Sequence, residues 1–127
     1  MTAAQSALQR ESKRICVVED DDDLRESIVA AIHRSGFQTV DFSNASAALE
    51  ELRHQSCDCV LSDISMPGMS GFEFFSIARA DGMETPWLFM SGNAMFRHAV
   101  PTGAKLLVKP FSTEELITEL TMVMTLS

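Results

Sequence analysis

The segment CVLSDISMPGMSG, residues 59–71, joins an apolar run to an acid and then to a turn. A continuous apolar run such as residues 59–61 is typical of a strand in a parallel sheet that is covered on both faces. Asp63 follows this run after a single serine, and the Pro, Gly and Ser residues from 66 to 71 predict a turn. The segment therefore predicts a buried strand that delivers an acidic side chain to the start of a loop.

Four further apolar runs surround this one, and helical patterns separate them. The first helical pattern stops at Gly36, Ser43 or Asn44 caps the next helix, and residues 94–100 have room for only a short helix before Pro101. This alternation predicts an α/β class, doubly wound fold: a five-stranded parallel sheet with helices on both faces and a short fourth helix. The predicted strands are residues 15–18, 39–42, 59–61, 87–90 and 106–108.

The composition indicates one acidic domain. The 127 residues fit a single core, and we predict a tail at residues 1–13 and one domain over residues 14–127. The formal net charge of −8 and the lack of a basic run argue against nucleic acid or a membrane surface as a partner. No apolar stretch reaches the roughly 20 residues of a membrane span, and the N-terminus does not resemble a secretory signal. We therefore expect a cytoplasmic protein.

The chain has three cysteines, Cys16, Cys57 and Cys59, all in or beside apolar runs. They offer one Cys-x-Cys pair, and His54 is the one histidine close to it in sequence. This set favours buried, reduced thiols over a metal site or a disulfide.

Four of the five apolar runs end in side chains that can do chemistry. The carboxyl ends of parallel strands share one edge of a sheet, so we expect these side chains to meet there. The acids supply oxygen ligands, which suit a hard cation such as Mg²⁺. A lysine and a hydroxyl beside them complete a set suited to phosphoryl transfer, with an aspartate as the nucleophile. The residues are Glu19, Asp20, Asp63, Ser91 and Lys109.

These motifs resemble the receiver domain of bacterial two-component response regulators. The resemblance extends over residues 14–126 and implies the flavodoxin-like strand order 2-1-3-4-5. Because it covers nearly the whole chain, we expect a single-domain response regulator that acts by binding a downstream protein or within a phosphorelay. The segments that carry it are VVEDD at 17–21, LSDISMPGMSG at 61–71, FMSG at 89–92 and VKPF at 108–111.

The resemblance also implies a role for each site residue. Asp63 would accept a phosphoryl group from the phosphohistidine of a sensor histidine kinase or a histidine phosphotransfer protein. Ser91 and Lys109 would contact that group, and the Lys109–Pro110 bond would be cis. Mg²⁺ would be the cofactor. Its ligands would be Glu19, Asp20, Asp63 and the backbone carbonyl of Ser65.

The sequence departs from the family's pattern in three places. Glu19 stands where the family more often has aspartate, and Leu106 stands where it often has Tyr or Phe. The segment between Ser91 and Lys109 is several residues shorter than usual. We therefore expect a truncated or irregular helix there and an unconventional output surface.

Other interpretations apply to some of these residues. We expect Asp22 and Asp23 to cap the first helix and to favour the positive end of its dipole, rather than to bind a metal ion. For the whole chain, the alternative to a phosphoryl-accepting switch is an interaction module with the same fold that is not phosphorylated. An enzyme is disfavoured, because the acidic loop after the first strand would repel an unescorted phosphate. We predict a phosphoacceptor that assists its own phosphorylation and dephosphorylation. The sequence favours no particular oligomeric state.

Overall fold

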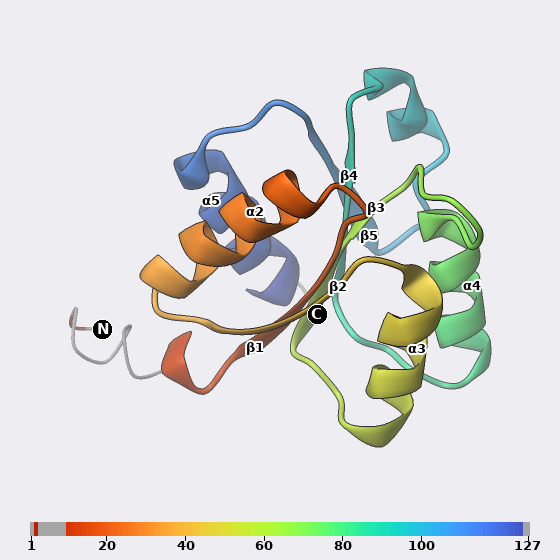
Figure 1. Cartoon of the computed structure of the whole chain (residues 1–127), viewed down its shortest axis with the longest axis horizontal. Helices are drawn as coiled ribbons and strands as arrows, with labels where there is room; N and C mark the ends of the chain where they lie inside the picture. Colours follow the sequence, from red (N-terminus) through yellow and green to blue (C-terminus); the bar gives the residue numbers. More distant parts are fainter. Residues whose placement is uncertain (1, 3–9, 126–127) are drawn as a thin grey trace.

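The computed structural model describes Thr2 and residues 10–125, so most of the predicted tail lies outside the described residues. Within the described part, no helix is long and apolar enough to cross a membrane. Strands and helices alternate along the chain (Figure 1). The elements are β1 (Arg14–Val18), α2 (Asp22–Arg34), β2 (Gln38–Phe42), α3 (Ala45–His54), β3 (Cys59–Asp63), α4 (Gly71–Ala80), β4 (Trp87–Ser91), the 3₁₀ helix η1 (Ala94–His98), β5 (Ala104–Val108) and α5 (Thr113–Thr125).

The five strands form one parallel sheet in the order β2-β1-β3-β4-β5, which confirms the predicted fold class and strand order. Helices α2 and α5 cover one face, and α3 and α4 cover the other (Figure 1). The three central strands are buried on both faces, as their continuous apolar runs predicted. The outer strands β2 and β5 each leave one edge of the sheet unpaired with another strand of the described chain.

Each face of the sheet has its own hydrophobic core. Ile28 and Ile32 of α2 and Leu120 of α5 pack on one face. On the other face, Phe74 of α4 packs edge-on against Trp87, with ring centroids 4.7 Å apart. The three cysteines are buried, as predicted, and none of them forms a disulfide within the described residues.

Side chains at the helix starts explain where the helices begin. Asp21 caps α2, accepting a hydrogen bond of 3.0 Å from the Leu24 N–H, and Asn44 caps α3. Asp22 and Asp23 occupy the first turn of α2, where negative charge favours the positive end of the helix dipole. The acids that follow Asp20 therefore stabilise the helix, as predicted, with Asp21 as the cap itself.

The helix between β4 and β5 is short, as predicted. It is the single 3₁₀ segment η1, and the Asn93 side chain caps it by accepting from the Met95 N–H at 3.0 Å. Its residues are partly or fully exposed, unlike those of the longer helices. The side of the sheet beside β5 is therefore covered less completely than the rest.

Gly71, the first residue of α4, packs against the end of β3. Its N–H donates to the Ile64 carbonyl at 2.8 Å. A Cβ atom at this position would overlap the carbonyl oxygen of Asp63 and lie 2.9 Å from Ile64 Cα. Only a residue without a side chain lets α4 approach this strand so closely, and this contact fixes the backbone of Asp63.

Gly71→Ala is expected to lower the free energy of unfolding by about 1–3 kcal/mol, because the backbone of Asp63 must shift to admit the methyl group. Urea denaturation monitored by circular dichroism measures this change. Gly92→Ala is the matched control, since a Cβ there meets no atom within 4 Å. Equal stabilities of the two variants would contradict the packing argument.

Candidate functional site

The sheet brings the predicted site residues to one edge. Asp63 ends β3 and Ser91 ends β4, while Glu19 and Lys109 directly follow β1 and β5. Asp63 is paired in register with Met90, the residue before Ser91. Parallel strands in register therefore carry side chains distant in sequence to one place.

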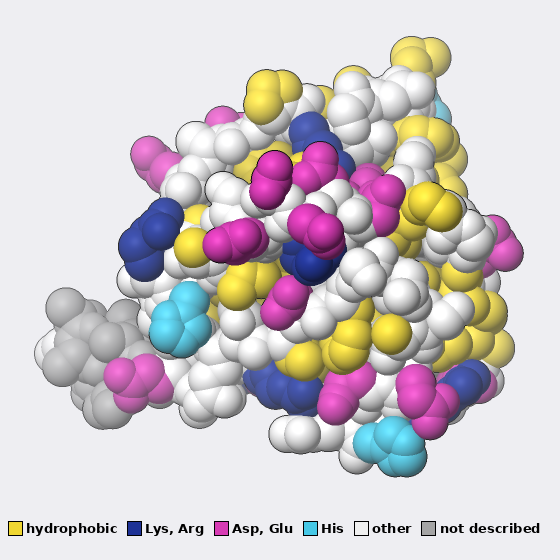
Figure 2. Space-filling model, in the orientation of Figure 1, with side chains coloured by type: hydrophobic (Ala, Val, Ile, Leu, Met, Phe, Trp, Pro, Cys, Tyr) yellow, Lys and Arg dark blue, Asp and Glu magenta, His cyan; other side chains and the backbone are white. Residues whose placement is uncertain are grey.

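Three carboxylates lie together at this edge. Glu19, Asp20 and Asp63 each offer an oxygen, and these oxygens all lie within 4.8 Å of one another. Glu19 is 1% exposed and Asp63 is 6% exposed, while Asp20 is exposed to solvent. Figure 2 shows acidic side chains gathered over the region where α2 begins. The cluster is therefore anchored in the protein and open on one side.

Lys109 connects the two buried acids. Its Nζ lies 2.6 Å from Glu19 Oε1 and 3.2 Å from Asp63 Oδ2. Burial by itself lowers the pKa of this ammonium, but the hydrogen bond that it donates to Glu19 and the charge of Asp63 outweigh burial, so the pKa of Lys109 is raised. The lysine therefore stays charged and neutralises part of the acidic cluster.

Asp20 forms no ion pair with Lys109 or with any other residue that the structure describes. Desolvation, followed by its contact with Glu19, raises the pKa of the Asp20 carboxyl. A raised carboxyl pKa means that the surroundings disfavour the ionised form. The negative charge left over after Lys109 is therefore concentrated at the open side of the cluster, where a cation can reach it.

Glu19 is held by its neighbours at both its backbone and its side chain. The Asp21 N–H donates to Glu19 Oε2 at 3.1 Å, and a guanidinium N–H of Arg25 donates to the Glu19 carbonyl at 2.8 Å. Arg25 also pairs with Asp22 and Asp41, at 2.7 and 3.1 Å. The sequence did not predict Arg25 as a positioning residue. Arg25 and Asp22 are three positions apart, which is the spacing of an ordinary ion pair on a helix surface.

Ser91 is buried, and its Oγ accepts a hydrogen bond from the Asn93 N–H at 3.0 Å. This contact uses a lone pair and leaves the hydroxyl proton free to donate. The Ser91 carbonyl accepts from the Lys109 N–H at 2.8 Å, and the Lys109–Pro110 peptide bond is cis. The backbone thus joins the hydroxyl and the ammonium of the site directly.

Ser65 and Leu106 are the remaining residues singled out from the sequence. Ser65 is exposed in the loop that follows Asp63, and its role as a carbonyl ligand stays a prediction. Leu106 is 6% exposed and belongs to the core cluster that also contains Phe89. Phe96 of η1 packs against this cluster. A leucine therefore fills the place where the family often has an aromatic ring.

The donor set fits a hard divalent cation. Every candidate ligand is an oxygen, and two of the acids are held in the fold by contacts independent of any ion. Like-charged carboxylates this close favour binding of a cation that relieves their repulsion. Mg²⁺ keeps several of its waters, so a cluster open on one side suits it.

Comparison with known proteins agrees with this geometry. The family model of the response regulator receiver domain matches residues 15–121. The chain is 33% identical over 112 residues to the response regulator receiver protein CpdR of Brucella abortus, covering 85% of this chain and 93% of CpdR. It is 31% identical to the response regulator protein TodT of Pseudomonas putida, of which it spans 53% of the length.

Solved structures show the same fold. The response regulator TrrA of Thermotoga maritima, determined in complex with Mg²⁺-BeF, matches with a TM-score of 0.80 at 25% identity, covering 87% of this chain and 98% of that one. The family model spans most of the chain, and CpdR is itself named a response regulator receiver protein. The chain belongs to the response regulator receiver domains, the signalling switches of two-component systems.

Proposed function

We propose that this receiver domain takes a phosphoryl group onto Asp63 from the phosphohistidine of a sensor histidine kinase or a histidine phosphotransfer protein. The reaction requires Mg²⁺ and takes place in the cytoplasm. The phosphorylated protein then signals by binding a partner protein or passes the group along a relay. The observation that carries the proposal is the position of Lys109 Nζ between Glu19 and Asp63, beside an open third acid.

Asp63 is the acid best suited to act as the nucleophile. Glu19 is more deeply buried and is held by Lys109 and the Asp21 N–H, whereas Asp20 lies outside the contact with Lys109. A carboxylate oxygen of Asp63 attacks the phosphorus, an O–P bond forms and the P–N bond to the donor imidazole breaks. The imidazole nitrogen keeps the electron pair and takes a proton from solvent.

The other side chains neutralise and orient the transferred group. Lys109 is within 3.2 Å of Asp63 and can pair with a phosphoryl oxygen without leaving the site. The free proton of the Ser91 hydroxyl can donate to another phosphoryl oxygen. Fixed positive charge and fixed donors supply most of the catalysis in phosphoryl transfer.

Glu19, Asp20, Asp63 and the carbonyl of Ser65 are the proposed metal ligands. Bound Mg²⁺ supplies positive charge that neutralises the phosphoryl oxygens during transfer. Glutamate in the first of these positions is compatible with the fold, because Lys109 and the Asp21 N–H hold one carboxylate oxygen each.

Incubation with Mg²⁺ and acetyl phosphate is expected to add one phosphoryl group to the protein, and Asp63→Asn is expected to remove this gain. An amide cannot act as the nucleophile, whereas its size and burial match those of the acid. Intact-protein mass spectrometry measures the gain, and omission of Mg²⁺ is expected to suppress it. Asp23→Asn, in the first turn of α2, is the matched control and keeps the gain.

Two results would overturn the proposal. One is the absence of any mass gain in the wild-type protein with several small phosphoryl donors. The other is a gain that survives Asp63→Asn and maps to a different residue. The first result would favour the interaction module that is not phosphorylated.

Asp20→Asn is expected to raise the Tm of the metal-free protein and to reduce the further rise in Tm that Mg²⁺ gives the wild type. The folded-state pKa of Asp20 is raised, so at neutral pH its ionised form opposes folding, and this cost disappears when the charge is removed. A bound cation stabilises the folded state only while its ligands are present.

Thermal unfolding at neutral pH, with a chelator and then with Mg²⁺, measures both effects. Asp23→Asn serves again as the control and is expected to keep the full Mg²⁺-dependent gain, since it lies outside the cluster. A lower Tm of metal-free Asp20→Asn, or an undiminished response to Mg²⁺, would contradict the assignment of Asp20 as a ligand.

A further inference from the structure

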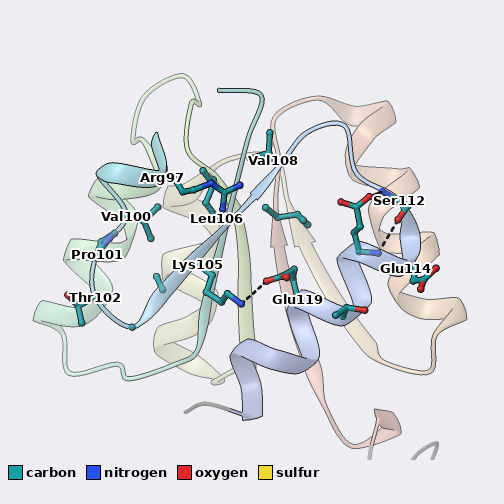
Figure 3. Close-up of a pocket in the computed structure, with 15 residues that line it drawn as sticks. Arg97, Val100, Pro101, Thr102, Lys105, Leu106, Val108, Ser112, Glu114 and Glu119 are labelled. Carbon is teal, nitrogen blue, oxygen red and sulfur yellow. Dashed lines mark hydrogen bonds and ion pairs between the residues drawn. The ribbon is translucent and has the colours of Figure 1, made fainter. Parts of the chain in front are cut away.

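A groove of about 950 Å³ runs along the outer edge of β5. One wall is residues 100–103, the loop that follows η1, and the other wall is α5 (Figure 3). Every residue of β5 from Ala104 to Val108 contributes to the lining. The floor of the groove is therefore the edge of the sheet itself.

The backbone of β5 directs into this groove N–H and C=O groups that pair with no residue of the described part of the chain. The Lys109 N–H donates to the Ser91 carbonyl, so in the alternation of a strand Lys105, Leu107 and Lys109 face β4. The N–H and C=O groups of Leu106 and Val108 consequently point away from β4. An edge with free N–H and C=O groups can pair with one more strand.

The short η1 helix explains why this edge lies open. Only residues 92–103 connect β4 to β5, and five of them form η1. The Ala104 N–H donates a hydrogen bond of 3.1 Å to the Pro101 carbonyl. Among the described residues, the loop therefore pairs with the first residue of β5 but not with Leu106 or Val108. The rest of the edge is left for a segment from outside.

The two walls impose different side chains on such a segment. The α5 wall carries Glu114, Glu115 and Glu119, of which Glu119 pairs with Lys105 at 3.0 Å. The Glu114 carboxylate has no hydrogen bond or ion pair with any residue that the structure describes. The wall is therefore acidic on balance and favours basic side chains.

The opposite wall is apolar with one positive charge. Val100, Pro101 and Leu106 line it, and Arg97 at its rim disfavours a basic side chain there. Successive side chains of a strand point to opposite faces of a sheet. A strand that fits both walls therefore alternates basic residues toward α5 with apolar residues toward the loop.

We propose that an extended peptide segment of a partner protein, with alternating basic and apolar residues, binds in this groove as a sixth strand beside β5. Hydrogen bonds to the backbone of Leu106 and Val108 hold it, and the carboxylates of α5 select its basic side chains. This inference goes beyond phosphoryl transfer, because it assigns a binding surface that contains none of the acidic cluster.

A second copy of this chain fits the groove less well. If two β5 edges paired antiparallel about a twofold axis, the same face of each sheet would continue into its neighbour. The two α5 helices would then lie side by side, and their carboxylates would repel one another. The net charge of −8 adds to this repulsion.

The test uses the whole chain and a synthetic peptide in which lysine and valine alternate. Binding is expected to slow hydrogen exchange at the Leu106 and Val108 amides, as followed by NMR, and to weaken as salt rises. A peptide of the same composition, with all valines before all lysines, is expected to bind at least several-fold more weakly.

Glu114→Lys is expected to weaken binding of the alternating peptide several-fold. Glu26→Lys, an exposed substitution on α2 with the same change in net charge, is expected to leave it unchanged. The inference is overturned if the peptide does not bind, if the Leu106 and Val108 amides stay unprotected, or if the two peptides or the two variants behave alike. Concentration-dependent protection of the same amides without peptide would overturn it in favour of a second copy.

Discussion

Two carboxylates buried side by side repel each other, and the ammonium of Lys109 is what makes their burial possible. It lies within 3.2 Å of both Glu19 and Asp63, and it ties the end of β5 to the ends of β1 and β3. The third acid, Asp20, makes no ion pair with Lys109 and stays exposed to solvent. The cluster can therefore be buried in the folded protein and still attract a cation, which in turn would attract phosphoryl oxygens.

The fold supports this cluster mainly through its backbone. Gly71 brings α4 against the carbonyl of Asp63, and Arg25 ties the carbonyl of Glu19 to α2 and β2. The Lys109 N–H is bonded to the carbonyl of Ser91. Main-chain contacts of this kind hold the strand ends in place, so that Lys109 can contact both Glu19 and Asp63 at one edge of the sheet.

Strand β5 serves two parts of the molecule. Its carboxyl end delivers Lys109 to the acidic cluster, and its outer edge forms the floor of the groove beside α5. The short η1 helix leaves that edge exposed, and Leu106 fills the core behind it. Two of the three departures from the family's pattern, Leu106 and the shortened segment before it, therefore lie on one side of the sheet, whereas Glu19 follows β1.

The sequence by itself determined the alternation of strands and helices, the parallel sheet, the short fourth helix and the five candidate site residues at or next to the strand ends. These follow from local patterns, because apolar runs, capping residues and turn formers act over a few neighbouring positions. The tertiary structure alone decided which of the acids Lys109 contacts, that Arg25 holds Glu19, and that the edge of β5 lies open between two unlike walls. Those features depend on distances between residues up to 90 positions apart, which periodicity along the chain does not encode.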